Sequence, residues 1–365
     1  MLTDQLFDFL AASPSCYHAV QALAKRLEQN GYTQLREQDA WTLTPGGKYF
    51  VTRNGSSLLS FRIPQSAPAG FLMAAAHTDS PTFKIKHNPE KKSGPYVQLS
   101  TEKYGGMLMG TWFDRPLSVA GRIVTAKDGK LETKLVDVDR DLAVIPSVAI
   151  HMNRAANEGF KFMANIDTLP LYGMQESSGS VPVFCAFDNE EVGSETKQGA
   201  ASSLLSDTLR RIALALGLNE EGYLRMLAQS FLVSADNAHG VHPNHPEYAD
   251  MTNTPRLNGG VVIKFNANQR YTTDGVSCAL FTAVCREAGA PVQVYANRSD
   301  MPGGSTLGSI ATTKVSVPSV DIGLAQLAMH SCVESAGAED LDALVKAMTC
   351  YYGKTLTRSG EQITF

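Results

Sequence analysis

The stretch that decides the fold is residues 181–194, VPVFCAFDNEEVGS. An apolar run of strand-forming residues stops at Asp188, and the adjacent pair Glu190 and Glu191 follows before a Gly-Ser turn. The simplest explanation of such a charged pair is a solvent-exposed turn, because acidic residues after strands are ordinary turn formers. The pair becomes informative if other strands end in the same way, since the ends of parallel strands can lie together.

Three further apolar runs end in residues of the same kind. FLMAAA stops at His77 and Asp79, SFLVSA stops at Asp236, and SVDIGLAQLAM runs into His330. In an open α/β sheet the carboxyl ends of the parallel strands share one edge, and ligand sites form at that edge. We therefore expect these imidazoles and carboxylates to converge at a single rim, although each of them alone has an ordinary explanation as a hydrogen-bonded or solvated residue.

The predicted set of ligands favours a transition metal. Mixed imidazole and carboxylate ligands suit Zn²⁺ best, with Mn²⁺ and Co²⁺ as alternatives. Hydrolysis at such a centre also needs a base that takes the proton of water and hands it to the leaving amine. Side chains of neighbouring residues diverge on an extended or turning backbone, so one glutamate of the pair can bind the metal while the other faces the water.

Asp79 has two readings from its sequence position. It lies two residues after His77, the offset of a carboxylate that orients a metal-binding imidazole. A plain turn in HTDSP is the alternative, and the sequence alone leaves both open.

The rest of the chain predicts an α/β fold with a largely parallel sheet flanked by helices. Apolar residues recur at helical spacing within residues 2–10 and 19–27, which indicates two amphipathic helices separated by SPS. Residues 48–63 contain two β-rich runs around NGSS and predict a hairpin. Later strands alternate with helical stretches such as SSLLSDTLRRIALALG, CALFTAVCREAG and EDLDALVKAMTCYYG.

A change in the sequence pattern after residue 82 indicates an inserted domain. After residue 82 the chain breaks into short strand-like pieces such as YVQLS, GRIVTA and KLETKLV, separated by Gly, Pro and charged turns. We expect a β-rich domain over residues 83–179, inserted into an α/β catalytic domain made of residues 1–82 and 180–365. Two domains also fit a chain of 365 residues.

Composition excludes several classes of protein. Apolar residues make up 43% and charged residues 19%, which is typical of a globular chain, and a net charge of -4 argues against a nucleic-acid partner. The N-terminus lacks the pattern of a signal peptide, and no apolar run is long enough to span a membrane. Six scattered cysteines without CxxC pairs suit a reducing cytoplasm, where we expect the protein.

The motifs together resemble the aspartyl aminopeptidase family of zinc metallopeptidases. The matching stretches lie in the family's order and cover nearly the whole chain: AAHTDSP, YGGMLMGTWFDRPLSVAGR, AIHMNRAANEGF, FDNEEVGSETKQGA, LVSADNAHGVHPN, VIKFNANQRY, RSDMPGGSTLG and DIGLAQLAMHS. The resemblance implies a zinc-exopeptidase-like catalytic domain with an inserted β-rich oligomerisation domain. It also implies removal of N-terminal residues, preferably Asp or Glu, from peptides by a homo-oligomer of the dodecameric type.

The resemblance assigns roles at the predicted rim. It implies four metal ligands, which are His77, Glu191, Asp236 and His330. Glu190 would be the general base, and Asp79 the supporting carboxylate.

Three further residues match substrate-contacting positions of the family. Lys264 matches the lysine that meets the acidic side chain of the substrate, and His239 matches another active-site histidine. His151, in the inserted domain, matches a histidine that reaches the active site of a neighbouring subunit, where it contacts substrate or serves as a further metal ligand. From the residues alone, a solvated lysine and surface imidazoles are the alternatives.

One departure from the family concerns the bridging ligand. Between Leu171 and Val183 the family carries a sizeable segment, with an LDN-like motif whose aspartate bridges two metals, and here the chain passes directly through SSGS, a linker-like composition. Asp114 and Asp167 match other family positions, so no bridging ligand is assigned. Because a bridging carboxylate screens the repulsion between two cations, we expect at least one metal position to be weakened or empty.

Three functional hypotheses follow from the sequence. The first is a cytoplasmic metalloaminopeptidase that prefers acidic N-terminal residues. The second is a non-catalytic or single-metal descendant that retains assembly but has lost the dinuclear site. The third is a related hydrolase that acts on N-acyl groups or C-terminal amides.

Overall fold

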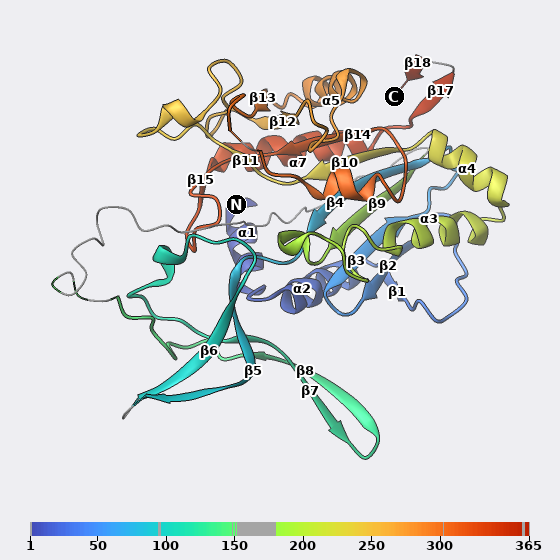
Figure 1. The fold of residues 1–365 in the computed structure, drawn as a ribbon. Helices are drawn as coiled ribbons and strands as arrows, with labels where there is room; N and C mark the ends of the chain where they lie inside the picture. The colour runs from blue at the N-terminus through green and yellow to red at the C-terminus, as the bar shows by residue number, and fades with distance from the viewer. Residues whose placement is uncertain are drawn as a thin grey trace.

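The computed structural model describes residues 2–93, 96–147, 149, 151, 180–301, 303–359 and 362–364. A nine-stranded sheet forms the centre of this described part (Figure 1). Its strands, in order across the sheet, are β1 (Thr33–Leu35), β2 (Lys48–Arg53), β3 (Ser57–Arg62), β9 (Val181–Phe187), β4 (Phe71–His77), β10 (Phe231–Ala235), β14 (Ser319–Gly323), β12 (Val261–Phe265) and β13 (Val292–Ala296).

Four adjacent strands of this sheet run in the same direction. β4 pairs in parallel with β9 along its whole length, from Phe71 opposite Val181 to His77 opposite Phe187. β10 is parallel to both β4 and β14. The sheet is largely parallel, as predicted, with antiparallel pairs between β2 and β3, β3 and β9, and β12 and β14. The carboxyl ends of β9, β4, β10 and β14 therefore lie at one edge.

Helices cover both faces of the sheet. The helices are α1 (Leu2–Ala11), α2 (Cys16–Gln29), α3 (Leu204–Ala215), α4 (Glu220–Ala228), α5 (Gly275–Glu287), α6 (Leu307–Ala311) and α7 (Ala338–Tyr352). Both predicted N-terminal helices are confirmed, and Ser15 of the SPS stretch accepts the backbone N–H of His18 at the start of α2. A capping box between Asp274 and Ser277 begins α5 in the same manner.

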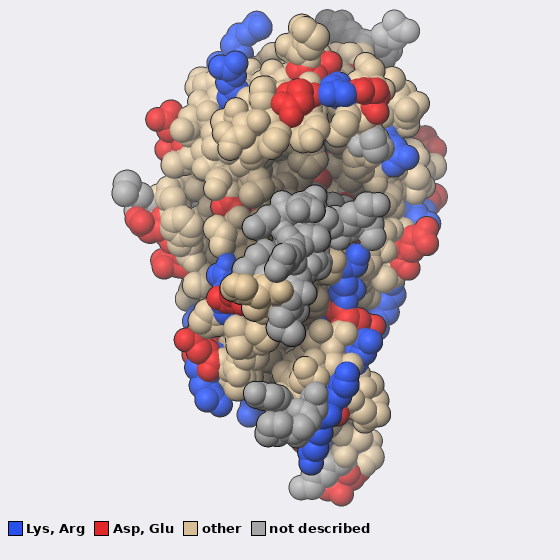
Figure 2. Space-filling view, turned by 60° about the vertical axis from the view of Figure 1, so that its left-hand side comes forward, with Lys and Arg blue, Asp and Glu red and all other residues tan. Residues whose placement is uncertain are grey.

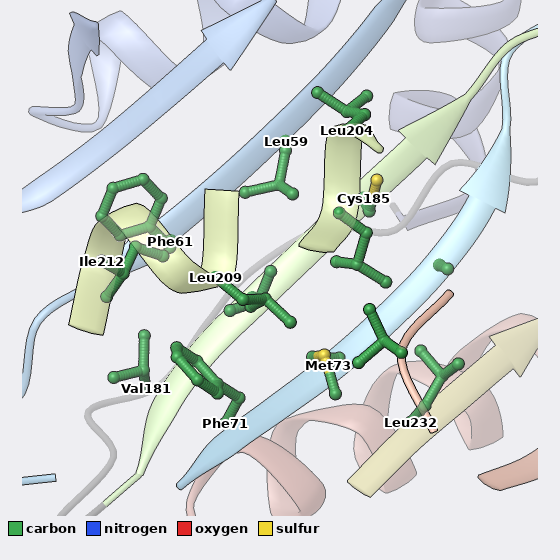
Figure 3. Close-up of a cluster of buried hydrophobic side chains, with 14 of the residues drawn as sticks. Leu59, Phe61, Phe71, Met73, Val181, Cys185, Leu204, Leu209, Ile212 and Leu232 are labelled. Carbon is green, nitrogen blue, oxygen red and sulfur yellow. The ribbon is translucent and has the colours of Figure 1, made fainter. Parts of the chain in front are cut away.

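The apolar core divides into two layers because side chains alternate across each strand. On one face, Leu204, Leu209 and Ile212 of α3 pack against side chains of β3, β9, β4 and β10 (Figure 3). On the other face, α5 and α7 pack against β10, β14 and β12. The hydroxyl group of Tyr351 in α7 donates to the carbonyl groups of Met73 and Phe231, so this helix is tied to β4 and β10 in the core.

The chain leaves the sheet between the adjacent strands β4 and β9. The excursion contains two separate hairpins, β5 (Thr82–Ser93) with β6 (Tyr96–Tyr104), and β7 (Ala120–Lys127) with β8 (Lys130–Asp137). Both project away from the sheet in Figure 1. The β-rich texture expected for residues 83–179 is present in the described part of this range, whereas the end of the range, residues 152–179, lies outside the described residues.

Small elements complete the described part. Two small sheets are formed by β11 (Ala238–His239), β15 (Ala325–Leu327) and β16 (Ser335–Ala336), and by β17 (Thr357–Ser359) and β18 (Gln362–Thr364). Short 3-10 helices are η1 (Met109–Trp112), η3 (Glu190–Val192) and η4 (Pro246–Tyr248).

Among the described helices, none combines the length and the apolar character that a membrane crossing requires. Figure 2 brings forward the side on which β11 and β15 lie, and this face is hollowed.

Candidate metal centre

Three potential ligands meet where β4 and β9 end. His77 is the last residue of β4, and Glu190 and Glu191 begin η3 after the two residues that follow β9. One ligand atom from each of the three lies within 4.8 Å of the others. The turn between β9 and η3 is built by Asn189, whose φ of 60° lies in the left-handed region that Asn tolerates better than most residues. This turn brings both glutamates back over the end of the neighbouring strand.

Asp79 holds this part of the site together. Its Oδ1 lies 3.4 Å from Nδ1 of His77 and accepts the backbone N–H of Glu190 at 3.2 Å. Its Oδ2 accepts the backbone N–H of Glu191 at 3.3 Å and the hydroxyl group of Tyr104 at 2.7 Å. The backbone carbonyl group of Asp79 lies closer still to Nδ1, at 3.1 Å. Because both groups of Asp79 face Nδ1, Nε2 is the ring nitrogen left for a metal, as expected of a residue that orients a metal-binding imidazole.

The ionisation of His77 and Asp79 is coupled. Burial lowers the pKa of His77, but the hydrogen bond to Asp79 and the negative charge of Glu190 outweigh burial and raise it well above the ordinary value. Burial raises the pKa of Asp79, but the hydrogen bond and charge of His77 outweigh it, so the pKa is lowered. The pair is therefore most stable as an imidazolium and a carboxylate while no metal competes for the ring.

Asp236 and His330 each present a buried atom without a hydrogen-bond partner among the described residues. Asp236 follows β10 directly, and its Oδ1 is the unpartnered atom, whereas its Oδ2 accepts Nζ of Lys264 at 3.2 Å. His330 is 5% exposed, with φ at 75°, and its Nε2 is unpartnered. Buried polar atoms are rarely left without partners, so these two atoms are positioned for a ligand that carries positive charge.

Electrostatic coupling links these residues to the β4 and β9 ends. Burial lowers the pKa of His330 to about 2, with further contributions from the charges of His239 and His77, so its imidazole is neutral and able to bind a metal. Burial also raises the pKa of Glu190 to about 7, where His77 opposes the increase and Asp236 supports it. The structure thus brings residues from four strand ends into one electrostatic environment.

The three predicted substrate-contacting residues have different positions. Lys264 of β12 is 1% exposed and lies beside Asp236. His239, on β11, has a pKa lowered first by loss of hydration and then by the nearby charge of Lys264. His151 is an exposed turn residue of the inserted part and is not among the residues that meet at the rim within this one chain. Its predicted contact with a neighbouring subunit stays a prediction.

The alternative carboxylates have other partners. Asp114 is exposed, with φ at 56°, and accepts the backbone N–H of Ser147 at 2.8 Å, which is the arrangement of a loop cap. Asp167 lies outside the described residues. Among the described residues, the group of possible ligands close enough to share one ion consists of His77, Glu190 and Glu191. The described structure therefore supplies no candidate for the bridging aspartate.

Sequence reasoning missed the polar residues that support the rim. Tyr104, at the end of β6, joins Asp79 to Asn189 and so links the inserted part to the site. The carboxylate of Glu334 accepts the backbone N–H of His330 and the side-chain amide of Gln326. Gln326 in turn accepts an amide N–H of Asn237 at 2.6 Å. Tyr104 lies 85 residues from Asn189, and Gln326 lies 89 residues from Asn237, so no local pattern could have indicated these contacts. Glu334 lies only four residues after His330, but no motif marks it as the partner of that backbone N–H.

The donor set fits a zinc ion. Ligand atoms of His77, Glu190 and Glu191 lie within 4.8 Å of one another, whereas Asp236 and His330 fall outside this group of described residues. Asp236 and His330 each have a buried atom without a hydrogen-bond partner in the described part of the chain, and Asp79 lies beside Nδ1 of the His77 ring. His77 and His330 would supply nitrogen ligands, and Glu191 and Asp236 would supply oxygen ligands. Glu190 would remain free to act on water beside the ion.

Comparisons with known proteins point to one family. The sequence profile of a family described as aminopeptidase I zinc metalloprotease (M18) matches residues 9–182 and 174–352. A probable M18 family aminopeptidase 2 from Clostridium acetobutylicum is 39% identical over 422 residues, which cover 95% of this chain and 98% of the relative.

Solved structures share the fold. The cryo-EM structure of the Ape4 and Nbr1 complex contains a chain that superposes with a TM-score of 0.88 at 33% identity, covering 96% of this chain and 85% of that chain. The S. cerevisiae mApe1 dodecamer superposes with a TM-score of 0.81 at 24% identity and covers 96% of both chains. At that lower identity the likeness concerns the fold alone.

The comparisons also bear on the missing segment. The profile match divides into two ranges that meet at residues 174–182, between Leu171 and Val183, where the segment was expected to be absent. The alignment with the C. acetobutylicum relative extends over 422 residues, although this chain has 365. The relative therefore contains positions that have no counterpart here.

The raised pKa of Glu190 predicts a pH-dependent cost to stability. The group binds a proton in the folded chain up to a pH of about 7, whereas its ordinary pKa is 4.5. Between these values the folded state binds more protons, so the contribution of Glu190 to the free energy of unfolding falls as the pH rises. We expect a Glu190→Gln variant of the metal-free protein to gain stability relative to the parent as the pH rises from 5 to 8, measured by urea unfolding. A stability difference that is the same at both pH values would contradict this.

Glu334 is expected to matter for metal binding although it is not a ligand. A Glu334→Ala variant loses the acceptor of the His330 backbone N–H. The imidazole ring of His330 should then be held less firmly in its position. Outer partners of metal ligands typically change metal affinity by about 10–100-fold, and we expect a loss of this size for Zn²⁺ in a competition titration against a chelator. Glu339→Ala, an exposed change on α7, is the matched control. Equal affinities of the two variants would show that Glu334 has no such role.

Proposed function

Since the chain belongs to the M18 family of zinc metalloproteases, we propose that it is a metal-dependent aminopeptidase that releases N-terminal residues, preferably Asp or Glu, from peptides. The observation that carries the proposal most is the pair of unpartnered buried atoms, Nε2 of His330 and Oδ1 of Asp236, at the rim that also holds His77 and both glutamates. Such a rim is suited to a cation and to hydrolysis beside it.

Glu190 is proposed as the general base. Its pKa of about 7 makes the carboxylate a better proton acceptor than an ordinary glutamate and allows the protonated form to donate near neutral pH. It can therefore take a proton from water at its carboxylate and deliver the proton to the nitrogen of the leaving amine. A zinc ion, when bound, supplies polarisation of the scissile carbonyl group and a more acidic water.

Asp79 and Tyr104 keep this base in position. The carboxylate of Asp79 holds the backbone N–H groups of both Glu190 and Glu191, so the two side chains start from a fixed backbone. Tyr104 donates to Asp79 and accepts from Asn189, which fixes the turn before the glutamates. One carboxylate can then remain at the metal while its neighbour moves a proton.

Lys264 and His239 are proposed to recognise the substrate. An ammonium group beside the rim favours a substrate with an acidic N-terminal side chain. His239 is held neutral by its surroundings, so its ring can both donate and accept hydrogen bonds near neutral pH. We assign to His151 a contact with substrate, or with the metal, in a neighbouring subunit of a homo-oligomer.

Zinc is the proposed metal, with Mn²⁺ or Co²⁺ as alternatives, because the same ligand types serve all three. The cytoplasm is the proposed location, and it fits the six free cysteines. The alternative function is a single-metal or non-catalytic descendant. It is favoured by the positions of the C. acetobutylicum relative that this chain lacks, and by the absence of a bridging carboxylate among the described residues.

Hydrolysis of aminoacyl p-nitroanilides tests the activity. With added Zn²⁺, Mn²⁺ or Co²⁺ we expect the Asp and Glu substrates to be cleaved faster than the Leu substrate. Loss of the base in Glu190→Gln should lower kcat by about 10²–10⁴-fold, while the exposed control Glu195→Gln should leave it unchanged. Bound metal without turnover would favour the non-catalytic alternative. Cleavage of N-blocked substrates alone would favour a hydrolase of another specificity.

Assembly is the second proposed property that can be measured. Apolar side chains are exposed on the two hairpins, among them Val97 at 66% and Leu131 at 76%, and neither hairpin is paired with a further described strand. We propose that these surfaces are covered in a homo-oligomer, which the dodecameric mApe1 structure illustrates for a related fold. Light scattering should give a mass several times that of one chain, and a monomer at micromolar concentration would contradict the proposal.

A further inference from the structure

Lys264 is a buried lysine whose ammonium group contacts Asp236, a proposed ligand of the candidate metal centre. Its side chain is 2% exposed, and Nζ donates to Oδ2 of Asp236 and to the backbone carbonyl group of Asn237, both at 3.2 Å. The same nitrogen lies 5.1 Å from the centre of the Tyr271 ring. In the chain without substrate these contacts engage the ammonium, which has three N–H groups to donate.

The two oxygens of Asp236 are divided between different tasks. Oδ2 accepts Lys264, and Oδ1 is buried without a partner among the described residues. A buried carboxylate requires a compensating positive charge, and Lys264 is the cation that supplies one directly in this arrangement. A metal at the rim would use the free Oδ1 of the same carboxylate.

We propose that Lys264 is a built-in counter-cation of the metal centre, which pairs with Asp236 when no metal is bound and weakens the hold of Asp236 on the metal when one is bound. The inference rests on the proposed role of Asp236 as a ligand and is independent of the proposed preference for acidic substrates. Lys264 is thus a positioning residue that acts through Asp236.

The sign of the effect follows from charge. A neighbour that accepts a proton from a ligand strengthens that ligand, and its removal weakens metal binding. Lys264 does the opposite, because it donates to the ligand and also repels a cation through a medium of low effective dielectric constant. Removing its charge should therefore tighten metal binding and, at the same time, leave a buried carboxylate uncompensated in the metal-free chain.

The test compares Lys264→Met with Lys264→Arg in the full chain after removal of metal. Zn²⁺ affinity is measured by competition with a chromophoric chelator, and stability of the metal-free protein by urea unfolding. We expect Lys264→Met to bind Zn²⁺ about tenfold more tightly or better, while its metal-free form unfolds at lower urea than the parent. Lys264→Arg keeps the charge and should retain the affinity of the parent, as should the exposed control Lys314→Met.

The opposite changes in affinity and stability separate this role from a purely structural one. A buried lysine that only supports the fold would lower both when it is replaced. Weaker or unchanged Zn²⁺ binding by Lys264→Met overturns the proposal, whether or not the protein hydrolyses peptides. Should this variant fail to fold, Lys264→Gln is titrated in its place. In the Asp236→Asn background only the direct repulsion between Lys264 and the metal remains, so adding Lys264→Gln there should tighten Zn²⁺ binding less than it does in the parent.

Discussion

The parallel pairing of β9, β4, β10 and β14 is the constraint on which the rest of the structure depends. Because these strands run in one direction, His77, the Glu190–Glu191 pair, Asp236 and the chain that leads to His330 all emerge at one edge of the sheet. A reversal of any one strand would carry its ligand to the opposite edge, about 20 Å away for strands of this length. The apolar layers on both faces of the sheet hold this alignment.

Charge balance is the second requirement of the site. Several carboxylates gather at the rim, and two of them lie beside a cationic side chain of the same chain. The His77 ring lies beside the carboxylate of Asp79, and the ammonium of Lys264 lies beside that of Asp236. At Glu190, burial raises the pKa instead. Within the described part of the rim, Oδ1 of Asp236 and Nε2 of His330 are buried without a hydrogen-bond partner and mark the place where this internal compensation is incomplete.

The sequence predicted those features that depend on local patterns. Alternating apolar residues and strand-end polar residues indicated the α/β class, the parallel edge and the rim residues, because strand direction and side-chain spacing follow from short stretches. It could not predict that Tyr104 crosses from the inserted part to Asp79, or that Glu334 holds the strained backbone of His330. Tyr104 and Asp79 are 25 residues apart, and Glu334, although only four residues after His330, has no sequence pattern that marks it as the partner of that backbone N–H.

The most direct test of a shared rim is the metal content of the intact protein with one distant ligand removed at a time. Native mass spectrometry of protein loaded with Zn²⁺ should show tightly held metal in the parent. His77→Ala and His330→Ala, which remove proposed ligands from β4 and from the loop after β15, should both lose it. Full metal content in either variant, with the fold intact by circular dichroism, would contradict a single centre built from these strand ends.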